Sequence, residues 1–199
     1  VAKTYPAEMG TLAVNQGLQV LGGYGYTEDF PLEQMARDVR IMSIYEGTTG
    51  IHGLTLLGRG IPSNNGQALQ TLGKWIAKDI ELGKSSDLVA KYAGMLEAEV
   101  ANLTKVTMHK LGIAMQGKFD IYLADSTLYM ELFGLITVAW QWLKQGNVAA
   151  AAIKAGGLST DELAFYQDKI HTMKFFFHYE VPKTLGLSKR LLDEEVLTI

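Results

Sequence analysis

The sequence contains no cysteine and only four prolines among its 199 residues. Without cysteine the chain forms no disulfide and no thiolate metal site, which excludes a cysteine-stapled secreted fold. An excess of positive charge is also missing, because 18 basic and 21 acidic residues leave a formal net charge of −3. Nucleic-acid-binding proteins normally carry a basic excess, so we expect no nucleic-acid partner.

The sequence also lacks an apolar run long enough for a membrane span. Its densest apolar stretch, 128–143, is 16 residues long and contains Glu131 and Gln141. A spanning helix needs about 20 mostly apolar residues, so we interpret this stretch as a buried helix of a bundle. The first residues show neither an initiator methionine nor the apolar core of a signal peptide. We therefore expect them to be an internal part of a longer protein.

Hydrophobic residues make up 48% of the sequence, which is enough to bury a sizeable core. The four prolines stand where helices can begin or end, and no alternating strand pattern occurs. We therefore predict an all-α protein, an antiparallel helical bundle with no significant sheet. The helices are expected at residues 6–21, at a short segment after 29, and at 48–57, 67–83, 86–116, 118–145, 159–179 and 182–197, with an alanine-rich turn at 147–155.

Polar residues mark several of the expected helix starts. Ser159 and Glu162 have the spacing of a capping box. Thr48 or Thr49 can cap the helix that follows it. The segment 61–66 combines turn-forming residues with a proline, so we place a boundary between two subdomains, 1–60 and 61–199, at this point.

The residues that point to chemistry lie between positions 19 and 52. A glycine cluster at 22–25 could approach a phosphate closely, but no strand precedes it, so by itself it indicates a helix end and a turn. Further on, Glu46 stands between Tyr45 and Gly47, just before the helix expected to begin at Thr48. A carboxylate there is favoured by the helix dipole, so Glu46 taken alone indicates only a structural role.

The combination of these residues resembles the C-terminal signature of the acyl-CoA dehydrogenase family. The matching positions are Gln19-Val-Leu-Gly22-Gly23-Tyr-Gly25-Tyr26, then Asp29, Pro31, Glu33, Arg37-Asp38 and Ile41, and finally Ile44-Tyr45-Glu46-Gly47-Thr48. The resemblance implies that residues 1–60 end the family's C-terminal helical domain. Residues 61–199 look like the helical C-terminal extension of a longer branch of the family.

The resemblance implies a role for each residue of the signature. Glu46 matches the base that removes the α-proton of an acyl-CoA thioester, while a hydride leaves the β-carbon for the flavin. Its backbone N–H matches a donor that stabilises the thioester oxygen. The other matched residues are Tyr45 and Gly47 beside the substrate, Thr48 at the FAD, and Gln19, Gly22, Gly23 and Gly25 at the FAD of a neighbouring subunit.

Partners and cofactor follow from the same resemblance. They are an acyl-CoA substrate, an acceptor such as electron-transfer flavoprotein, and further copies of the chain in a dimer or tetramer. The setting would be fatty-acid β-oxidation in the bacterial cytoplasm, or alternatively in the mitochondrial matrix. The family's N-terminal helical domain and middle β-domain, which supply most flavin contacts, are not among these residues. We therefore expect the chain alone neither to retain FAD nor to turn over substrate.

Other interpretations of the sequence stay open at this point. The chain could be a non-catalytic module for helical interaction or oligomerisation, or a family member that has lost catalysis, although Glu46 argues against the latter. His171 and His178 could share a helix face with Glu180 nearby, but no close histidine pair exists and we expect no metal site. The aromatic run 175–179 is interpreted as core or subunit interface, with an exposed patch for a partner as the alternative.

Overall fold

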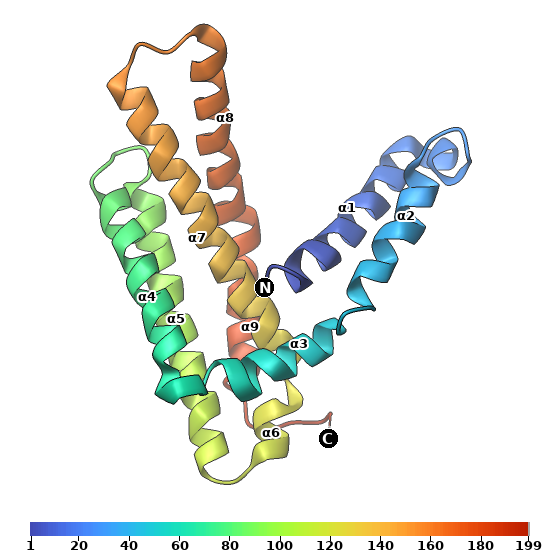
Figure 1. Ribbon diagram of the computed structural model, residues 1–199, viewed down its shortest axis with the longest axis vertical. Coiled ribbons are helices and arrows are strands. Elements are labelled where there is room, and N and C mark those ends of the chain that lie inside the picture. The colour runs from blue at the N-terminus through green and yellow to red at the C-terminus, as the bar shows by residue number, and fades with distance from the viewer. Residues whose placement is uncertain (199) are drawn as a thin grey trace.

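The computed structural model describes residues 1–198, and every element within that range is helical, which confirms the all-α prediction (Figure 1). Two of the α-helices continue as a short π-helix. The elements are α1 (Thr4–Leu21), a 3-10 turn (Gly22–Tyr26), α2 (Leu32–Arg40), a 3-10 turn (Ile41–Ser43), α3 (Thr49–Thr55) with a π-helical end (Leu56–Gly60), α4 (Ser63–Lys84), α5 (Ala90–Met115), α6 (Phe119–Ala124), α7 (Ser126–Ala155), α8 (Thr160–Phe175) with a π-helical end (Phe176–Glu180), a 3-10 turn (Val181–Lys183) and α9 (Thr184–Leu191).

The helices form a bundle and a separate arm. Helices α4 and α5 make one antiparallel pair and α7 and α8 a second, and the two pairs stand side by side (Figure 1). Helix α7 is central, because it packs against α3, α4, α5, α8 and α9. Helices α1 and α2 pack on each other and lean away from the bundle, with α3 running from the arm to its base.

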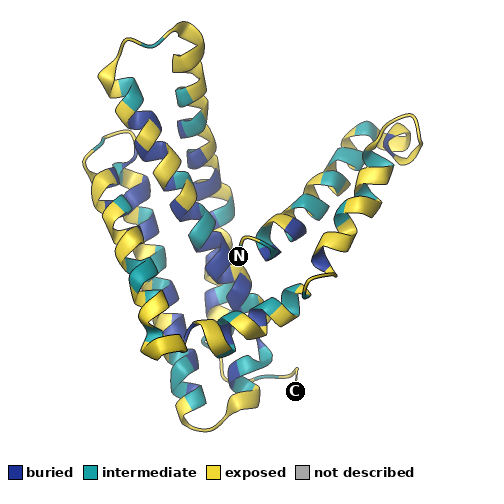
Figure 2. Ribbon diagram, viewed as in Figure 1, coloured by how far each residue is buried: buried dark blue, intermediate teal, exposed yellow. Residues whose placement is uncertain are grey.

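The core lies where the two pairs face each other (Figure 2). Tyr129, Leu132 and Ile136 of α7 are at most 1% exposed, as are Leu96 and Val106 of α5. Burying each of the four aliphatic side chains among them stabilises the fold by about 1.5–3 kcal/mol. The arm is much more exposed, because two helices alone bury only the faces that they turn toward each other.

One glycine lets the arm side of the chain reach the bundle. Gly53 of α3 lies so close to the start of α7 that an added Cβ would stand 2.7 Å from the Ser126 carbonyl oxygen. A contact this short leaves no space for any side chain. Helix α3 therefore rests directly on the backbone of α7.

The structure corrects the helix prediction at α7. The expected helix 118–145 is broken at Asp125 (φ −97°, ψ 26°), which separates α6 from α7. Beyond Gln145, α7 runs on through the alanine-rich segment to Ala155, where a separate turn was expected. Alanine favours helix strongly, and the buried Asn147 donates its side-chain N–H to the Asp79 carbonyl oxygen at 2.9 Å, which holds this part of α7 against α4.

The last expected helix is shorter than predicted, because α9 ends at Leu191 and not at residue 197. The Arg190 guanidinium donates to the Asp193 and Glu195 carbonyl oxygens at 3.2 and 2.8 Å, which folds the chain back over the helix end. Within residues 1–198, no helix has the length and apolar character needed to cross a bilayer, α7 included, as expected for the stretch 128–143.

Candidate functional site

The segment from Tyr45 to Thr48 forms a tight loop between α2 and α3. Thr48 has an extended backbone (φ −66°, ψ 163°), and its hydroxyl accepts the Ile51 N–H at 3.4 Å, so it is the N-cap of α3. This confirms the prediction that a threonine begins the helix at this point. The loop is therefore anchored at its downstream side by the first turn of α3.

The backbone of this loop is left-handed at two successive residues. Glu46 has φ 57° and Gly47 has φ 88°. Glycine adopts such angles freely, but a residue with a Cβ does so at a cost, so Glu46 needs support from its surroundings. The Lys3 ammonium donates to the Gly47 carbonyl oxygen at 2.7 Å, and His52 Nε2 lies 3.0 Å from the Glu46 carbonyl oxygen.

A pocket of about 320 Å³ opens beside this loop, between α1 and α2. It is walled mainly by aliphatic groups, with one carboxylate and one ammonium among them. Its lining is Ala2, Lys3, Pro6, Ala7, Val39, Met42, Tyr45 and Glu46. The Glu46 side chain is exposed in this chain, and Tyr45 is 48% exposed. The Glu46 carboxylate thus lies at the edge of a mainly apolar pocket and is exposed on the surface of the arm.

The expected cofactor residues fall into two separate groups. Thr48 lies in the loop with Glu46, whereas Gln19 and the glycines at 22–25 lie at the far end of α1. Lys3, which binds the loop, is 16 positions before Gln19, which along a helix corresponds to about 24 Å. The chain therefore does not bring these residues together around one ligand.

The individual glycines differ in what they offer a dinucleotide. A Cβ on Gly25 would lie 2.6 Å from the Leu18 carbonyl oxygen, so Gly25 is needed for packing within the arm. Gly22 (φ 59°) and Gly23 are exposed, and an added Cβ on either would meet nothing within 4 Å. Their backbone is therefore accessible to a cofactor such as FAD. No enclosed site surrounds these two glycines, so they could contact FAD from one side only.

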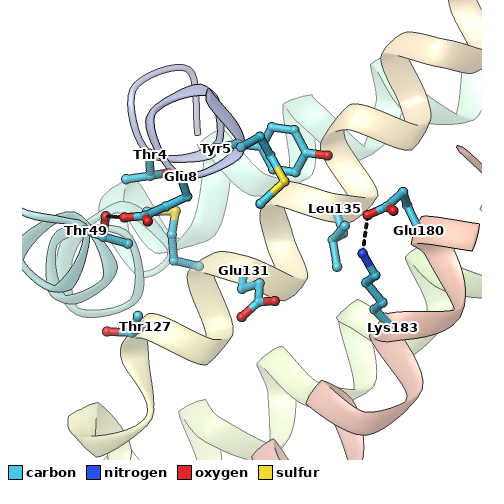
Figure 3. A pocket seen from close by; sticks show the side chains of 11 residues that line it. Thr4, Tyr5, Glu8, Thr49, Thr127, Glu131, Leu135, Glu180 and Lys183 are labelled. Atoms are coloured by element: carbon cyan, nitrogen blue, oxygen red, sulfur yellow. Dashed lines mark hydrogen bonds and ion pairs between the residues drawn. The ribbon is translucent and has the colours of Figure 1, made fainter. Parts of the chain in front are cut away.

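A larger pocket of about 400 Å³ lies where the arm meets the bundle (Figure 3). Glu8 of α1 accepts a hydrogen bond from the Thr49 hydroxyl at 2.5 Å, which ties α1 to the first residue of α3. On the opposite side Lys183 pairs with Glu180 at 2.6 Å. Glu46 does not line this pocket. The Glu8–Thr49 bond is one more contact that fixes the helix following the Glu46 loop.

The remaining residues singled out from the sequence lie in the bundle. Within residues 1–198, no three histidine, aspartate or glutamate side chains gather closely enough to hold a metal ion. Phe176 and Phe177 are buried. Phe175 and Tyr179 stack on each other with ring centroids 4.6 Å apart and are 51% and 65% exposed. The aromatic run is thus divided between the core and the surface.

Two residues of the site, Lys3 and His52, were not given a role by the sequence pattern. Lys3 reaches the loop across 44 positions of sequence, so no local spacing reveals the contact. His52 lies in the first turn of α3, six residues after Glu46. The sequence signal for this contact is weak: a polar side chain stands one turn into a helix, and a loop with a glycine precedes that helix.

Comparison with known proteins gives consistent matches along the chain. Residues 1–61 match the family described as "Acyl-CoA dehydrogenase, C-terminal domain", and residues 69–198 match "Acetyl-CoA dehydrogenase C-terminal like". The whole chain is 28% identical to a broad-specificity linear acyl-CoA dehydrogenase of Mycobacterium tuberculosis and covers 34% of that protein. Over 97% of its length it is 30% identical to the 3-methylmercaptopropionyl-CoA dehydrogenase of Ruegeria pomeroyi, of which it covers 32%.

A butyryl-CoA dehydrogenase of Syntrophomonas wolfei is 26% identical over 96% of the chain, which covers 31% of that relative. The chain thus spans about a third of the length of the curated relatives that it matches. The two matched family regions together run from the arm through the bundle and include the Glu46 loop. On this basis the chain belongs to the acyl-CoA dehydrogenase family, and its residues correspond to that family's C-terminal domains.

Proposed function

We propose that this chain is the C-terminal part of a flavin-dependent acyl-CoA dehydrogenase and that Glu46 is its catalytic base. The observation that carries the proposal is the Glu46 loop itself. Its carboxylate stands at the rim of an apolar pocket, on a left-handed backbone held by contacts from α1 and α3. A base for carbon acids needs this combination of a fixed carboxylate and an apolar surface beside it.

In the proposed reaction, the Glu46 carboxylate takes the α-proton of an acyl-CoA thioester. A hydride leaves the β-carbon at the same time, and the product is a trans-2-enoyl-CoA. When bound, FAD would supply the acceptor for that hydride. The Glu46 backbone N–H would stabilise the negative charge that develops on the thioester oxygen. Tyr45 and Gly47 would border the acyl chain, and Thr48 would contact the cofactor.

We further propose that these residues do not hold FAD by themselves. The Glu46 side chain is exposed in this chain, and the exposed glycines Gly22 and Gly23 form no enclosed site. The chain also spans only about a third of its curated relatives, which leaves most of a dehydrogenase outside these residues. The 199-residue chain, purified alone, should therefore be colourless. A flavin absorption band that persists through gel filtration would refute this part of the proposal.

The separation of Gln19 and the glycines from Glu46 along α1 supports a composite FAD site. Thr48, at one end of the arm, would contact the FAD of its own subunit. Gln19 and the glycines at 22–25, at the other end, would contact the FAD of a neighbouring subunit. The active enzyme is then a homo-oligomer, a dimer or tetramer. Electron-transfer flavoprotein is the proposed acceptor, and fatty-acid β-oxidation is the proposed setting. Within the chain, residues 1–60 would end the catalytic domain, and residues 61–199 would form the extension.

The base is tested by Glu46→Gln in the full-length protein. The variant should keep its yellow flavin but should not bleach when an acyl-CoA is added without oxygen, because the amide cannot take the α-proton. The control is Glu194→Gln, which removes an exposed carboxylate at the opposite end of the chain and should bleach normally. Bleaching by Glu46→Gln at the wild-type rate would place the base elsewhere.

A second candidate function is a non-catalytic interaction module. It is favoured by the exposed large apolar residues of the arm, among them Met9, Leu12, Val20 and Met35. The gene sequence upstream of Val1 separates the two proposals. A flavin-binding β-domain encoded there supports the dehydrogenase, whereas its absence would leave the module as the function of this chain.

A further inference from the structure

Glu46 holds an unfavourable backbone conformation at the residue that matters most for the proposed reaction. Its φ of 57° lies in the left-handed region, which disfavours residues with a Cβ. The angles φ and ψ of Glu46 set the direction in which Cβ, and with it the carboxylate, leaves the backbone. Such conformations persist only where surrounding contacts fix them. Whatever holds the loop therefore also aims the carboxylate.

His52 contacts the peptide group directly after Glu46. Its Nε2 lies 3.0 Å from the Glu46 carbonyl oxygen. Because a carbonyl only accepts hydrogen bonds, Nε2 carries a proton and donates it. The His52 backbone N–H donates to the Thr48 carbonyl oxygen at 3.0 Å, so the capped first turn of α3 fixes the backbone from which the imidazole projects.

Gly47 leaves the space that the imidazole occupies. A Cβ on Gly47 would lie 3.0 Å from His52 Nε2 and 3.4 Å from its Cε1, and the residue has φ 88°. Any side chain at this position would therefore press on the ring as well as strain the backbone. Gly47, which is proposed to border the acyl chain, thus has a second role: it leaves room for the His52 imidazole.

Lys3 holds the next peptide group from the other side. Its ammonium donates to the Gly47 carbonyl oxygen at 2.7 Å. Two successive carbonyls, those of Glu46 and Gly47, are therefore bound by donors from two different segments, α3 and the residue that precedes α1. Neither peptide plane can rotate without breaking a hydrogen bond, and the left-handed pair is locked between them.

We infer that His52 is a positioning residue for the Glu46 carboxylate, with Lys3, at the N-cap of α1, as its counterpart. The inference rests on the proposed function, because it gives His52 a role only if Glu46 acts as a base. Displacing a catalytic group by about 1 Å can cost on the order of 100-fold in rate, so loss of the donor should slow proton abstraction. Binding of substrate and flavin should change little, because His52 is not a lining residue of the pocket beside Glu46.

The test uses the full-length flavoprotein with butyryl-CoA, octanoyl-CoA or palmitoyl-CoA, whichever reduces the wild type fastest. Flavin reduction is followed in a single turnover, with ordinary and α-deuterated thioester. His52→Leu should reduce the rate constant about 10- to 100-fold. It should also raise the deuterium isotope effect, while the flavin content and the dissociation constant of the thioester stay at wild-type values.

Rescue distinguishes positioning from general damage. In His52→Gln the side-chain amide can still donate to the Glu46 carbonyl, so this variant should recover most of the lost rate. His171→Leu, at an exposed position of α8, is the matched control and should behave as wild type. If His52→Leu does not fold, Lys3→Met and Lys3→Arg make the same comparison from α1, with arginine retaining a donor.

The outcomes separate this inference from the proposed function. If Glu46→Gln is inactive but His52→Leu shows the wild-type rate and isotope effect, the positioning role is wrong and the base assignment stands. The positioning role is also wrong if His52→Gln is as slow as His52→Leu. If Glu46→Gln is itself active, the proposed function fails, and the role of His52 fails with it.

Discussion

The contact between Gly53 and the start of α7 makes a stability prediction of definite sign. A Cβ at Gly53 would lie 2.7 Å from the Ser126 carbonyl oxygen, 2.9 Å from its carbonyl carbon and 3.1 Å from the Thr127 nitrogen. All three are backbone atoms, so no side chain can turn away and relieve the overlap. In Gly53→Ala, α3 and α7 must move apart, and we expect the free energy of unfolding to fall.

The magnitude follows from two opposing effects. Forcing an extra methyl group into a close-packed contact costs about 1–3 kcal/mol, whereas alanine favours a helix over glycine by about 1 kcal/mol. The expected net loss is therefore up to about 2 kcal/mol, because the packing cost outweighs the helix preference at this backbone contact. For a protein of this size, each kcal/mol lowers Tm by about 2–4 °C.

Thermal unfolding of the chain, followed by circular dichroism, measures this loss. The matched control is Gly94→Ala on α5, where the glycine is exposed and an added Cβ meets nothing within 4 Å. The same chemical change should raise stability there by about 0.5–1 kcal/mol, because only the helix preference acts. The reasoning is refuted if both variants shift Tm in the same direction by the same amount.

Three further predictions concern buried or capped polar groups. Tyr122→Phe removes the hydroxyl that donates to the Leu57 carbonyl oxygen at 2.5 Å, and the buried, unpaired carbonyl should cost about 1–3 kcal/mol in urea unfolding. Burial lowers the pKa of the Lys110 ammonium from 10.5. Between the lowered pKa and 10.5 the unfolded state binds more protons than the folded state, so stability should rise as the pH rises toward 10.5. Lys110→Met should abolish this rise, measured as Tm against pH. Hydrogen bonds from the Ser159 N–H and hydroxyl lower the pKa of Glu162, so its stabilising effect should be lost as the pH falls below about 4.5, and Glu162→Gln should remove that part of the acid dependence.

Each of these measurements has an outcome that contradicts its premise. An unchanged urea midpoint for Tyr122→Phe would mean that the Leu57 carbonyl is satisfied without the hydroxyl. A Tm of Lys110→Met that rises with pH as steeply as the wild type would assign the alkaline dependence to another group. For Glu162→Gln, an acid unfolding curve that superimposes on the wild type would show that the capping carboxylate is not linked to folding.

Features set by neighbouring residues could be predicted from the sequence. The capping box of Ser159 and Glu162 is present with both of its hydrogen bonds, because serine and glutamate at that spacing satisfy the free N–H groups of a helix start. Thr48 caps α3 for the same local reason. The all-α class followed from the few prolines at possible helix ends and from the missing strand alternation, which are local features of the sequence.

Features set by distant residues could not be predicted. The Lys3 ammonium binds the Gly47 carbonyl across 44 positions, and the bond depends on how α1 and α3 meet. The break at Asp125 was missed because the helical pattern continues through it, while the Arg190 side chain that meets its carboxylate at 3.4 Å comes from α9. The left-handed angle of Glu46 was hidden as well, because glutamate gives no sign of it in sequence.

The backbone contact between α3 and α7 determines how this chain can be recombined with its relatives. The non-helical residues 64–66 near the start of α4, where φ is positive at three successive positions, look like the natural crossover point for a chimera. A crossover there would join Gly53 from one parent to the α7 backbone of another. Any difference in helix position between the two parents would then displace α3 and the Glu46 loop before it. A crossover before Thr48 would separate Glu46 from its helix cap. The loop, α3 and the bundle therefore have to be exchanged as one block, and substitutions in them are expected to accumulate together.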